Sequence, residues 1–349
     1  MSKPFGWAIV GLGRIAQRFA EALQRTASAR MVRVYGRNAI AAGEFCAKWQ
    51  ATQADRIEAG SDFAAVLADP LVQAVYIAST HNAHFDLALA CINAGKPVLC
   101  EKPLCMNVAQ TIALVQAAST RGVFLMEALW TRYLPAYERI GQWLQGGRIG
   151  RLKAVQSSFC FHVPYNADTA ASRIYNPALA GGCVLDIGVY NLSMTRWAMA
   201  QELARLQHRF DAAMPQITHA SGSLAPNGVD QHVLAHMRLQ HEDADIQAQF
   251  VCAFDCAADN RLRLFGELGY IETGPKFWQT TSASLHVADS VPEFADCAFG
   301  INGFEYELAE AMRCIGAGAI ESPHMTHAET LATAQQMAEL RAQLGAVGY

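Results

Sequence analysis

The order of hydrophobic and polar positions divides the chain into two halves. Up to about residue 125, short apolar runs alternate with segments whose apolar residues recur every three or four positions. This alternation is typical of a parallel sheet with helices on both faces. The expected strands are 6–10, 31–35, 74–78, 97–100 and 122–126, and the expected helices are 14–25, 39–50, 84–94 and 108–120.

After Glu127 the apolar positions take a period of two, which predicts successive strands of an antiparallel sheet with one face solvated or covered by a partner. The sequence therefore predicts an α/β domain over 1–126, with a doubly wound parallel sheet, and an α+β domain over 127–349, with an open-faced, mostly antiparallel sheet. The expected strands are 152–161, 217–224, 231–239, 245–255 and 260–266, and the expected helices are 134–145, 186–200, 303–315 and 326–344.

The first strand runs directly into Gly11-x-Gly13-x-x-Ala16. A helix that starts there presents free backbone N–H groups, and its dipole favours an anion. Gly11 permits the tight turn, Gly13 lets a pyrophosphate approach the backbone, and Ala16 lets helix and strand pack closely. With a strand before and a helix after, the motif predicts a dinucleotide site, with Arg14 and Ile15 beside it, rather than an ordinary glycine turn.

The next strand ends in Gly36-Arg37-Asn38 and lacks the acidic residue that takes the ribose hydroxyls of NAD in such folds. Gly36 leaves room, Arg37 offers a planar cationic fork for a 2′-phosphate or an adenine face, and Asn38 adds a donor. These residues predict NADP as cofactor. The alternative is a solvated Arg37, with NAD held through Asn38.

The strand at 74–78 leads into Ser79, Thr80, His81 and Asn82. Doubly wound sheets bind ligands at the carboxyl ends of their strands. We expect these four residues to neighbour the nicotinamide ribose, although a surface position is the default for such a histidine.

The strand at 97–100 delivers Glu101-Lys102-Pro103. A lysine at the end of a buried strand is costly unless it has a partner or a role. Beside a nicotinamide, Lys102 could polarise a substrate oxygen. Without the strand, an exposed lysine in a turn would be the better interpretation.

Composition limits the classes of partner. The chain is 52% hydrophobic and 17% charged, so it can bury a large core and a subunit interface. A net charge of −4 without a basic run argues against nucleic acid and anionic membranes. No apolar run approaches the ~20 residues of a membrane span, and the first residues lack the apolar region of a signal peptide. We therefore expect a cytoplasmic protein.

The ten cysteines are scattered singly, as expected of small buried hydrophobes in a reducing compartment. Cys252 and Cys256 have no matching second pair. No set of His, Cys, Asp or Glu has metal-ligand spacing, so the sequence predicts no metal site.

Gly11-x-Gly13-x-x-Ala16 and Glu101-Lys102-Pro103, at this separation, resemble the glucose–fructose oxidoreductase, inositol dehydrogenase and rhizopine-catabolism (Gfo/Idh/MocA) family. The resemblance implies a Rossmann NAD(P)-binding domain followed by a substrate domain. It extends over the stretches Glu127-Ala-Leu-Trp-Thr-Arg-Tyr-Leu-Pro135, Arg173-Ile-Tyr-Asn-Pro-Ala-Leu-Ala-Gly-Gly-Cys-Val-Leu-Asp-Ile-Gly-Val-Tyr190 and Ser322-Pro-His-Met-Thr-His-Ala-Glu-Thr-Leu331.

The branch of the family is also indicated. Many members carry histidine where this chain has Tyr190. The Asp-x-Gly-x-Tyr form, with Trp130-Thr-Arg132, is similar to dimeric dihydrodiol dehydrogenases and NADP-dependent D-xylose dehydrogenases. Ala180 departs from the family, which often has three glycines where this chain has Ala-Gly-Gly.

Asp186 and Tyr190 stand at i and i+4 of an expected helix and so share one face. A tyrosine whose pKa is lowered by nearby Lys102 could take the hydroxyl proton of an alcohol as hydride leaves its carbon. The resemblance implies the same roles for Lys102 and Tyr190, and leaves open which of them moves the proton. Asp186 could hold the substrate hydroxyl or orient Lys102. The alternative for Tyr190 is a core aromatic residue.

Further substrate contacts are expected around the cleft. Trp130 and Arg132 follow the last strand of the first domain, and Phe161 and Arg173 flank a loop at 162–182 that could cover the pocket. Aromatic walls with a few polar groups suit a sugar ring or a cyclic diol equally. Arg132 could reach cofactor or substrate, or form an interdomain salt bridge.

These features together predict an NADP-dependent oxidoreductase that acts on a secondary alcohol or carbonyl of a sugar or polyol-like substrate. One alternative is a trans-dihydrodiol dehydrogenase acting on cyclic diols. Another is an NADPH-sensing regulator, although a sensor needs neither Lys102 nor Tyr190. The open sheet face and the resemblance predict a homodimer or homotetramer.

Overall fold

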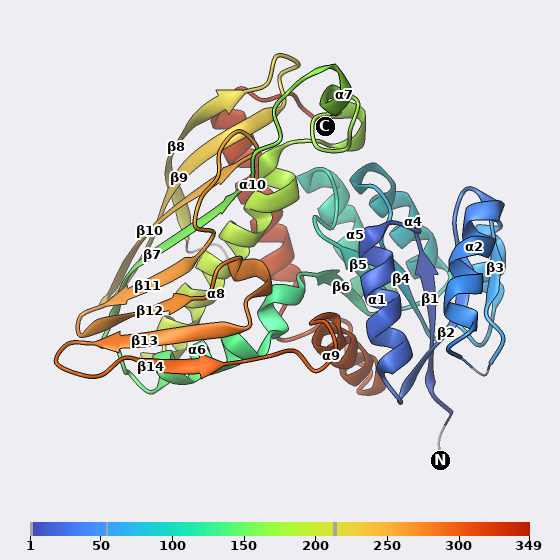
Figure 1. Cartoon of the computed structure of the whole chain (residues 1–349), viewed down its shortest axis with the longest axis horizontal. Coiled ribbons are helices and arrows are strands. Elements are labelled where there is room, and N and C mark those ends of the chain that lie inside the picture. Colours follow the sequence, from blue (N-terminus) through green and yellow to red (C-terminus); the bar gives the residue numbers. More distant parts are fainter. Residues whose placement is uncertain (1–2, 54, 212–214) are drawn as a thin grey trace. The chain divides into compact units, whose positions relative to one another are not determined.

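The computed structural model describes residues 3–53, 55–211 and 215–349 (Figure 1). By its internal contacts the chain forms two compact units. Unit 1 comprises Met1–Trp130 and Gly300–Thr330, and unit 2 comprises Thr131–Phe299 and Leu331–Tyr349. The linear division expected from the sequence placed the 300–330 segment with the second domain. It joins unit 1 because its helix packs on the first helix of the chain.

Unit 1 is built on a parallel six-stranded sheet in the order β3-β2-β1-β4-β5-β6, which confirms the expected doubly wound architecture. Its strands are β1 (Phe5–Val10), β2 (Ala29–Tyr35), β3 (Glu58–Gly60), β4 (Ala74–Ile77), β5 (Val98–Glu101) and β6 (Leu125–Ala128). Its helices are α1 (Arg14–Arg25), α2 (Ala39–Gln50), α3 (Phe63–Ala68), α4 (His81–Asn93), α5 (Val108–Arg121) and α9 (Phe304–Gly316).

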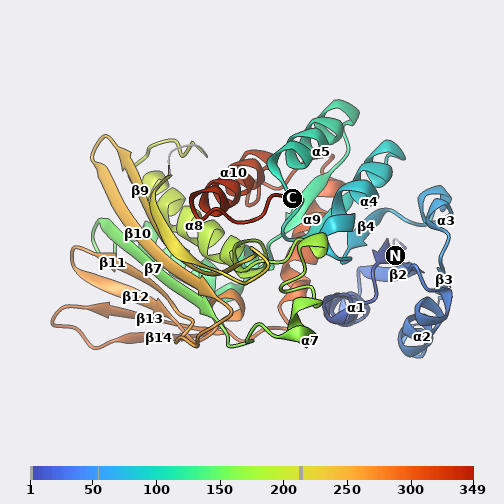
Figure 2. The ribbon, with the colours of Figure 1, turned by 90° about the horizontal axis from the view of Figure 1, so that it is seen from above.

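Helices cover both faces of this sheet, with α4 and α5 on one face and α1 on the other (Figure 2). The strands β4, β5 and the edge strand β6 are buried along their whole length, which explains their mainly apolar sequences. The sequence analysis missed β3 and α3. They have three and six residues, too few to show a hydrophobic period, and β3 has no buried residue.

Unit 2 contains an eight-stranded sheet in the order β14-β13-β12-β11-β7-β10-β9-β8. Every neighbouring pair is antiparallel except β7 and β10, which confirms a mostly antiparallel sheet. The strands are β7 (Leu152–Cys160), β8 (Gln216–Leu224), β9 (Asp230–His241), β10 (Ala244–Ala253), β11 (Leu262–Gly266), β12 (Gly269–Thr273), β13 (Ser282–Val287) and β14 (Glu293–Asp296).

One face of this sheet is covered and the other is open. Helix α8 (Val189–Arg205) packs on β7 and β10, and α6 (Pro135–Gln145) packs on β13, so β10 alternates buried and exposed residues (Figure 2). Strands β12 to β14 were not predicted. They are only four to six residues long, and β14 has no buried residue that could mark an inner face.

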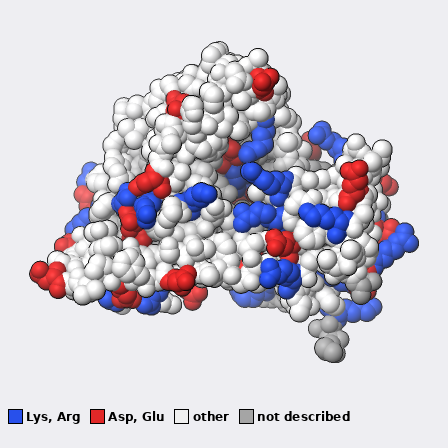
Figure 3. Space-filling view, in the orientation of Figure 1, with Lys and Arg blue, Asp and Glu red and all other residues white. Residues whose placement is uncertain are grey.

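The remaining elements are short, apart from α10 (His327–Gln343), which is the last helix of the chain. They are α7 (Ala167–Ala170), the π-helical turn η3 (Val184–Gly188) and the 3-10 turns η1 (Trp130–Tyr133), η2 (Pro177–Leu179) and η4 (Phe277–Gln279). No helix within the described ranges is long and apolar enough to cross a membrane. On the face drawn in Figure 3, basic and acidic side chains are interspersed.

A buried carboxylate joins several segments of unit 2. Asp230 is fully buried at the start of β9 and accepts hydrogen bonds from the Val184 N–H (2.8 Å) and from Arg341 Nε of α10 (3.0 Å). Burial raises the pKa of the Asp230 carboxyl, and the Arg341 charge and the Val184 N–H oppose that shift. A buried carboxylate needs such partners.

The same group fixes the turn before η3. Gly182 has φ +127°, and a Cβ atom there would lie 2.5 Å from Asp230 Oδ1. The Arg341 guanidinium lies 4.0 Å from the ring centre of Tyr349, whose hydroxyl donates to the Gly181 carbonyl oxygen. The Gly181–Gly182 turn is therefore held from β9, α10 and the C-terminal residues.

We predict that Arg341→Met lowers the free energy of unfolding by about 3 kcal/mol, because it leaves the buried Asp230 carboxylate without its cation. Urea denaturation measures this. Arg238→Met is the matched control, since Arg238 pairs with Asp245 on the surface and its loss should leave the midpoint nearly unchanged. Equal midpoints for the two variants would contradict the proposed importance of the buried pair.

Candidate active site

The turn between β1 and α1 has the geometry expected for a dinucleotide. Gly11 has φ +105°, and a Cβ there would lie 2.3 Å from the Ala78 carbonyl oxygen, so only glycine fits against the end of β4. Gly13 is the N-cap of α1 without a side-chain cap, and a Cβ there would meet nothing within 4 Å. The first backbone N–H groups of α1, at Arg14 and Ile15, thus border open space that a pyrophosphate could occupy.

At the end of β2, the neighbouring residues Gly36, Arg37 and Asn38 have different roles. A Cβ on buried Gly36 would lie 2.4 Å from Leu12 Cδ1, so Gly36 permits the packing of the glycine turn. Asn38 Oδ1 caps α2 by accepting from the N–H groups of Ile40 (2.9 Å) and Ala41 (3.2 Å), which leaves only its amide N–H groups for a ligand. Sequence analysis did not anticipate this capping role.

Arg37 is exposed and makes no hydrogen bond or ion pair with another residue in the described part of the chain. Its guanidinium is therefore available to a ligand at the end of β2. This position fits the predicted recognition of a 2′-phosphate, which remains a prediction.

The loop after β4 is tied to the loop after β5 by a buried histidine. Nδ1 of His84 lies 2.9 Å from the Pro103 carbonyl oxygen, and Nε2 lies 3.2 Å from that of Ser79. Burial lowers the pKa of His84. A neutral imidazole donates to one of these two carbonyl oxygens, and His84 lies between the two strand ends. The sequence indicated that His84 opens a helix, whereas α4 begins at His81. Nearby, Thr80 Oγ1 donates to Asn82 Oδ1 (2.7 Å), and the ring centre of His81 lies 5.8 Å from that of His84.

Lys102 follows the buried Glu101 at the end of β5 and is half-buried. Glu101 Oε1 accepts a hydrogen bond from the Tyr76 hydroxyl (2.5 Å). Burial raises the pKa of Glu101, which the Tyr76 hydrogen bond and the Lys102 charge oppose.

A second buried carboxyl group, which the sequence analysis missed, interacts with Glu101. Glu307 of α9 is fully buried, and neither carboxyl oxygen has a hydrogen-bond partner within the described residues. Burial, and then the charge of Glu101, raise the pKa of Glu307 well above its ordinary value. Burial therefore disfavours the charged form of Glu307, and Lys102 has the Glu101 carboxyl beside it as its acidic neighbour.

In unit 2, three predicted residues come together at η3. Arg173 Nη1 donates to Asp186 Oδ1 (2.8 Å), and Asp186 is 5% exposed. The Asp186 charge raises the pKa of the Arg173 guanidinium, with a smaller contribution from Tyr190. An α-helix was expected across Asp186, but the chain forms a π-helical turn there, a feature that is frequent at functional sites.

Tyr190 lies in an aromatic cluster and is 7% exposed. Its ring centre is 5.6 Å from that of Phe159, which stacks on Trp278 (3.4 Å) and lies 6.4 Å from Phe161. A polar pair thus sits beside a surface of aromatic rings, as a pocket for a sugar or a cyclic diol requires.

Two other predicted residues are engaged within their own units. Trp130 is 4% exposed and stacks on Phe304 (4.7 Å), with the Arg18 guanidinium 4.9 Å from its ring centre. Arg132 Nε donates to Ser193 Oγ (2.7 Å), and Nη2 donates to the Ser193 carbonyl oxygen (3.1 Å). These contacts give both residues a structural role, and their contact with substrate or cofactor remains a prediction.

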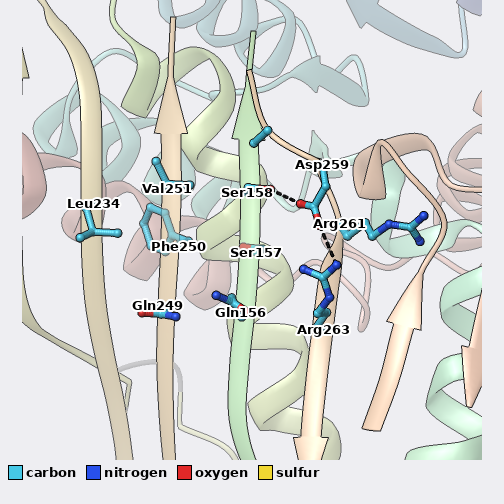
Figure 4. A pocket seen from close by; sticks show the side chains of 11 residues that line it. Gln156, Ser157, Ser158, Leu234, Gln249, Phe250, Val251, Asp259, Arg261 and Arg263 are labelled. Carbon is cyan, nitrogen blue, oxygen red and sulfur yellow. Dashed lines mark hydrogen bonds and ion pairs between the residues drawn. The ribbon is translucent and has the colours of Figure 1, made fainter. Parts of the chain in front are cut away.

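A pocket on the open face of the eight-stranded sheet contains none of the predicted residues (Figure 4). Asp259 accepts from Ser158 Oγ (3.0 Å) and from Arg263 Nη2 (2.6 Å) within it, beside the exposed Leu234. Ser158, Asp259 and Arg263 thus already pair with one another in this pocket.

Comparison with known proteins agrees with this geometry. Residues 5–129 match the model of an oxidoreductase family with an NAD-binding Rossmann fold, and residues 137–272 match the GFO/IDH/MocA C-terminal domain. The chain is 31% identical to trans-1,2-dihydrobenzene-1,2-diol dehydrogenase of Danio rerio, over 98% of this chain and 97% of the relative. The Mus musculus enzyme of that name is 32% identical, over 97% and 96%.

Solved structures show the same fold. The 3-ketoreductase KijD10 from Actinomadura kijaniata, in complex with NADP, superposes with a TM-score of 0.77 at 21% identity, over 98% of both chains. The aldose-aldose oxidoreductase from Caulobacter crescentus has a TM-score of 0.81 at 20% identity, over 98% of this chain and 97% of that chain.

The dinucleotide turn and the full-length match to dehydrogenases define the class: this protein is an NAD(P)-dependent oxidoreductase that acts on CH–OH groups. It belongs to the Gfo/Idh/MocA family, which confirms the family inferred from its motifs.

We predict that Gly13→Ala weakens NADPH binding about tenfold or more without lowering the melting temperature, because the added methyl group enters the open space at the start of α1. Fluorescence titration with NADPH measures the affinity. Gly43→Ala, also in open space but within α2, is the control and should bind NADPH normally. Unchanged binding by the Gly13 variant would exclude this turn as the pyrophosphate site.

Proposed function

We propose that this protein uses NADP to interconvert a secondary alcohol and a ketone or lactone on a sugar or polyol-like substrate. The observation that carries the proposal is the Arg173–Asp186–Tyr190 group beside an aromatic surface, in a chain that also has a dinucleotide turn. Hydroxyl-rich rings need a few fixed polar groups against an apolar wall.

The proposed chemistry assigns one role to each polar side chain. A bound nicotinamide accepts or donates the hydride. Lys102 donates a hydrogen bond to the reacting oxygen and stabilises negative charge on it. In the oxidation direction Tyr190 takes the hydroxyl proton, and in reduction it returns that proton. In the alternative assignment Lys102 moves this proton and Tyr190 donates the hydrogen bond to the reacting oxygen. Asp186, oriented by its hydrogen bond from Arg173, accepts a further hydrogen bond from a substrate hydroxyl.

A second candidate is the oxidation of trans-dihydrodiols. Two observations favour it: the relatives that are 31–32% identical bear that name, and the stacked rings of Phe159 and Trp278 suit a flat ring. The same Lys102 and Tyr190 would serve both reactions, so only the shape of the pocket separates them.

A regulator that binds NADPH without turnover is the rival from another class. It would retain tight NADPH binding and show no activity on any alcohol. The test is reduction of NADP, and separately of NAD, over a panel of aldoses, inositols and cyclic trans-diols. Turnover with one class of compound names the substrate, and its absence throughout favours the sensor.

We predict that Lys102→Ala and Tyr190→Phe each lower kcat about 10²- to 10⁴-fold with the best substrate of that panel, since each removes a group that acts on the reacting oxygen. Stopped-flow measurement of NADPH absorbance gives the rate. Lys153→Ala and Tyr270→Phe, both on the sheet surface, are matched controls and should keep full activity. Activity within threefold of the parent in both catalytic variants would overturn the mechanism.

We further propose that Arg37 makes the enzyme prefer NADP over NAD. Arg37→Ala should lower kcat/KM for NADP about 10- to 100-fold and change that for NAD little, because only NADP has the 2′-phosphate. Arg56→Ala, which removes another exposed arginine, is the control. A parent enzyme that prefers NAD, or an unchanged preference in Arg37→Ala, would contradict this role.

We also propose that the protein works as a homodimer or homotetramer in the cytoplasm, on small molecules rather than nucleic acid or membranes. Exposed Leu234, Tyr270 and Phe294 lie on strands of the open-faced sheet, which supports association through that face. Each of the ten cysteines is free, which supports a reducing compartment. Light scattering and cell fractionation test these two points.

A further inference from the structure

Three potential metal-binding side chains meet on unit 2, and none belongs to the groups described above. His208 follows α8, His241 ends β9, and Glu242 is the first residue of the turn to β10. Nδ1 of His208 lies 3.5 Å from Glu242 Oε2, and Nε2 of His241 lies 3.8 Å from Glu242 Oε1. The two imidazole ring centres are 5.1 Å apart.

These distances are close to those around a tetrahedral metal ion. Donors at about 2.0–2.1 Å from such an ion lie roughly 3.3–3.5 Å from one another. One ligand atom from each of the three residues lies within 4.8 Å of the others. Two imidazoles and one carboxylate suit a borderline divalent ion such as Zn²⁺, with water in a fourth position, and do not suit Mg²⁺.

The ring of His208 is oriented by a further carboxylate. Its Nε2 lies 2.9 Å from Asp243 Oδ1, and Asp243 is held in turn by Arg151, whose Nη2 lies 3.1 Å from Asp243 Oδ2. Metal-binding histidines commonly donate their second N–H to a carboxylate in this way.

In that orientation the second ring nitrogen, Nδ1, is directed at the Glu242 carboxylate. When Nε2–H donates to Asp243, the lone pair of Nδ1 faces the Glu242 carboxylate, and two acceptors meet. A bound metal ion satisfies both groups at once.

The sequence of the turn adds a separate indication. β9 and β10 are joined by the two residues Glu242 and Asp243, and Glu242 adopts φ +46°. Two-residue hairpin turns with positive φ favour Asn and Gly. Here two acidic residues take these places, and both carboxylates lie against His208.

A second cluster of His232, Asp255 and Cys256 also brings one ligand atom from each residue within 4.8 Å. There His232 Nδ1 already lies 2.7 Å from Asp255 Oδ1, so these two groups satisfy each other. This cluster is the weaker candidate and provides an internal control.

We propose that His208, His241 and Glu242 bind one divalent transition-metal ion of the zinc type, and that Asp243 is the positioning residue for His208. The ion joins the segment after α8 to the β9–β10 turn and takes no part in hydride transfer. Its binding would stabilise the folded protein by mass action.

The experiment is calorimetric titration of the full-length protein, treated with a chelator, with zinc chloride alone. We expect one site with a Kd of about 10 µM or tighter and a higher melting temperature in zinc. His241→Asn and Glu242→Gln should weaken binding at least tenfold, and Asp243→Asn about tenfold through the orientation of His208. Magnesium chloride should give no binding.

Controls separate the proposed site from other ligands. His236→Asn, on the same strand, and Cys256→Ser, in the second cluster, should bind zinc like the parent. The Glu242 side chain is 64% exposed, so Glu242→Gln should fold normally, which its metal-free melting temperature checks. Three results would overturn the proposal: a parent Kd above about 100 µM, parent-like affinity in Glu242→Gln, or loss of binding in Cys256→Ser.

Discussion

The buried carboxylate of Asp230 is the constraint on which the arrangement of unit 2 depends. It lies at the start of β9, binds Arg341 of α10 and the Val184 N–H of η3, and leaves no space for a side chain at Gly182. A charge without access to water must be paired, so these three segments take one arrangement only. The π-helical turn that carries Asp186 starts from this anchored point, and the orientation of the proposed substrate-binding groups follows from it.

Unit 1 is constrained differently, because the ends of its strands and the turns after them pack closely against one another. Gly11 lies against the end of β4, Gly36 lies against Leu12, and His84 bridges the carbonyl groups after β4 and β5. Parallel strands bring their carboxyl ends to one edge, where polar backbone groups need partners. The result is a closely packed edge with open space over Gly13, which is the form that a dinucleotide-binding turn takes.

The two units contribute different parts of an oxidoreductase. Unit 1 holds the dinucleotide turn and Lys102 with the Glu101 carboxyl beside it. Unit 2 holds Arg173, Asp186 and Tyr190 beside aromatic rings. Relatives named as diol dehydrogenases and structural neighbours that act on sugars share this architecture. Under the proposed function, the aromatic surface near Tyr190 would be the part that distinguishes a sugar from a cyclic diol.

The sequence by itself determined the doubly wound sheet, the mostly antiparallel second sheet and the family, because apolar period and glycine spacing are local properties of a chain. It also predicted a shared role for Asp186 and Tyr190, which remains a prediction. It did not reveal short elements such as β3 and β14, whose few residues carry no period. Only the tertiary structure decided the buried partners, such as Asp230 with Arg341 and Glu307 near Glu101, and the meeting of His208 with His241 and Glu242. These pairings join residues far apart in the sequence, and their energies depend on burial and distance, which no local pattern encodes.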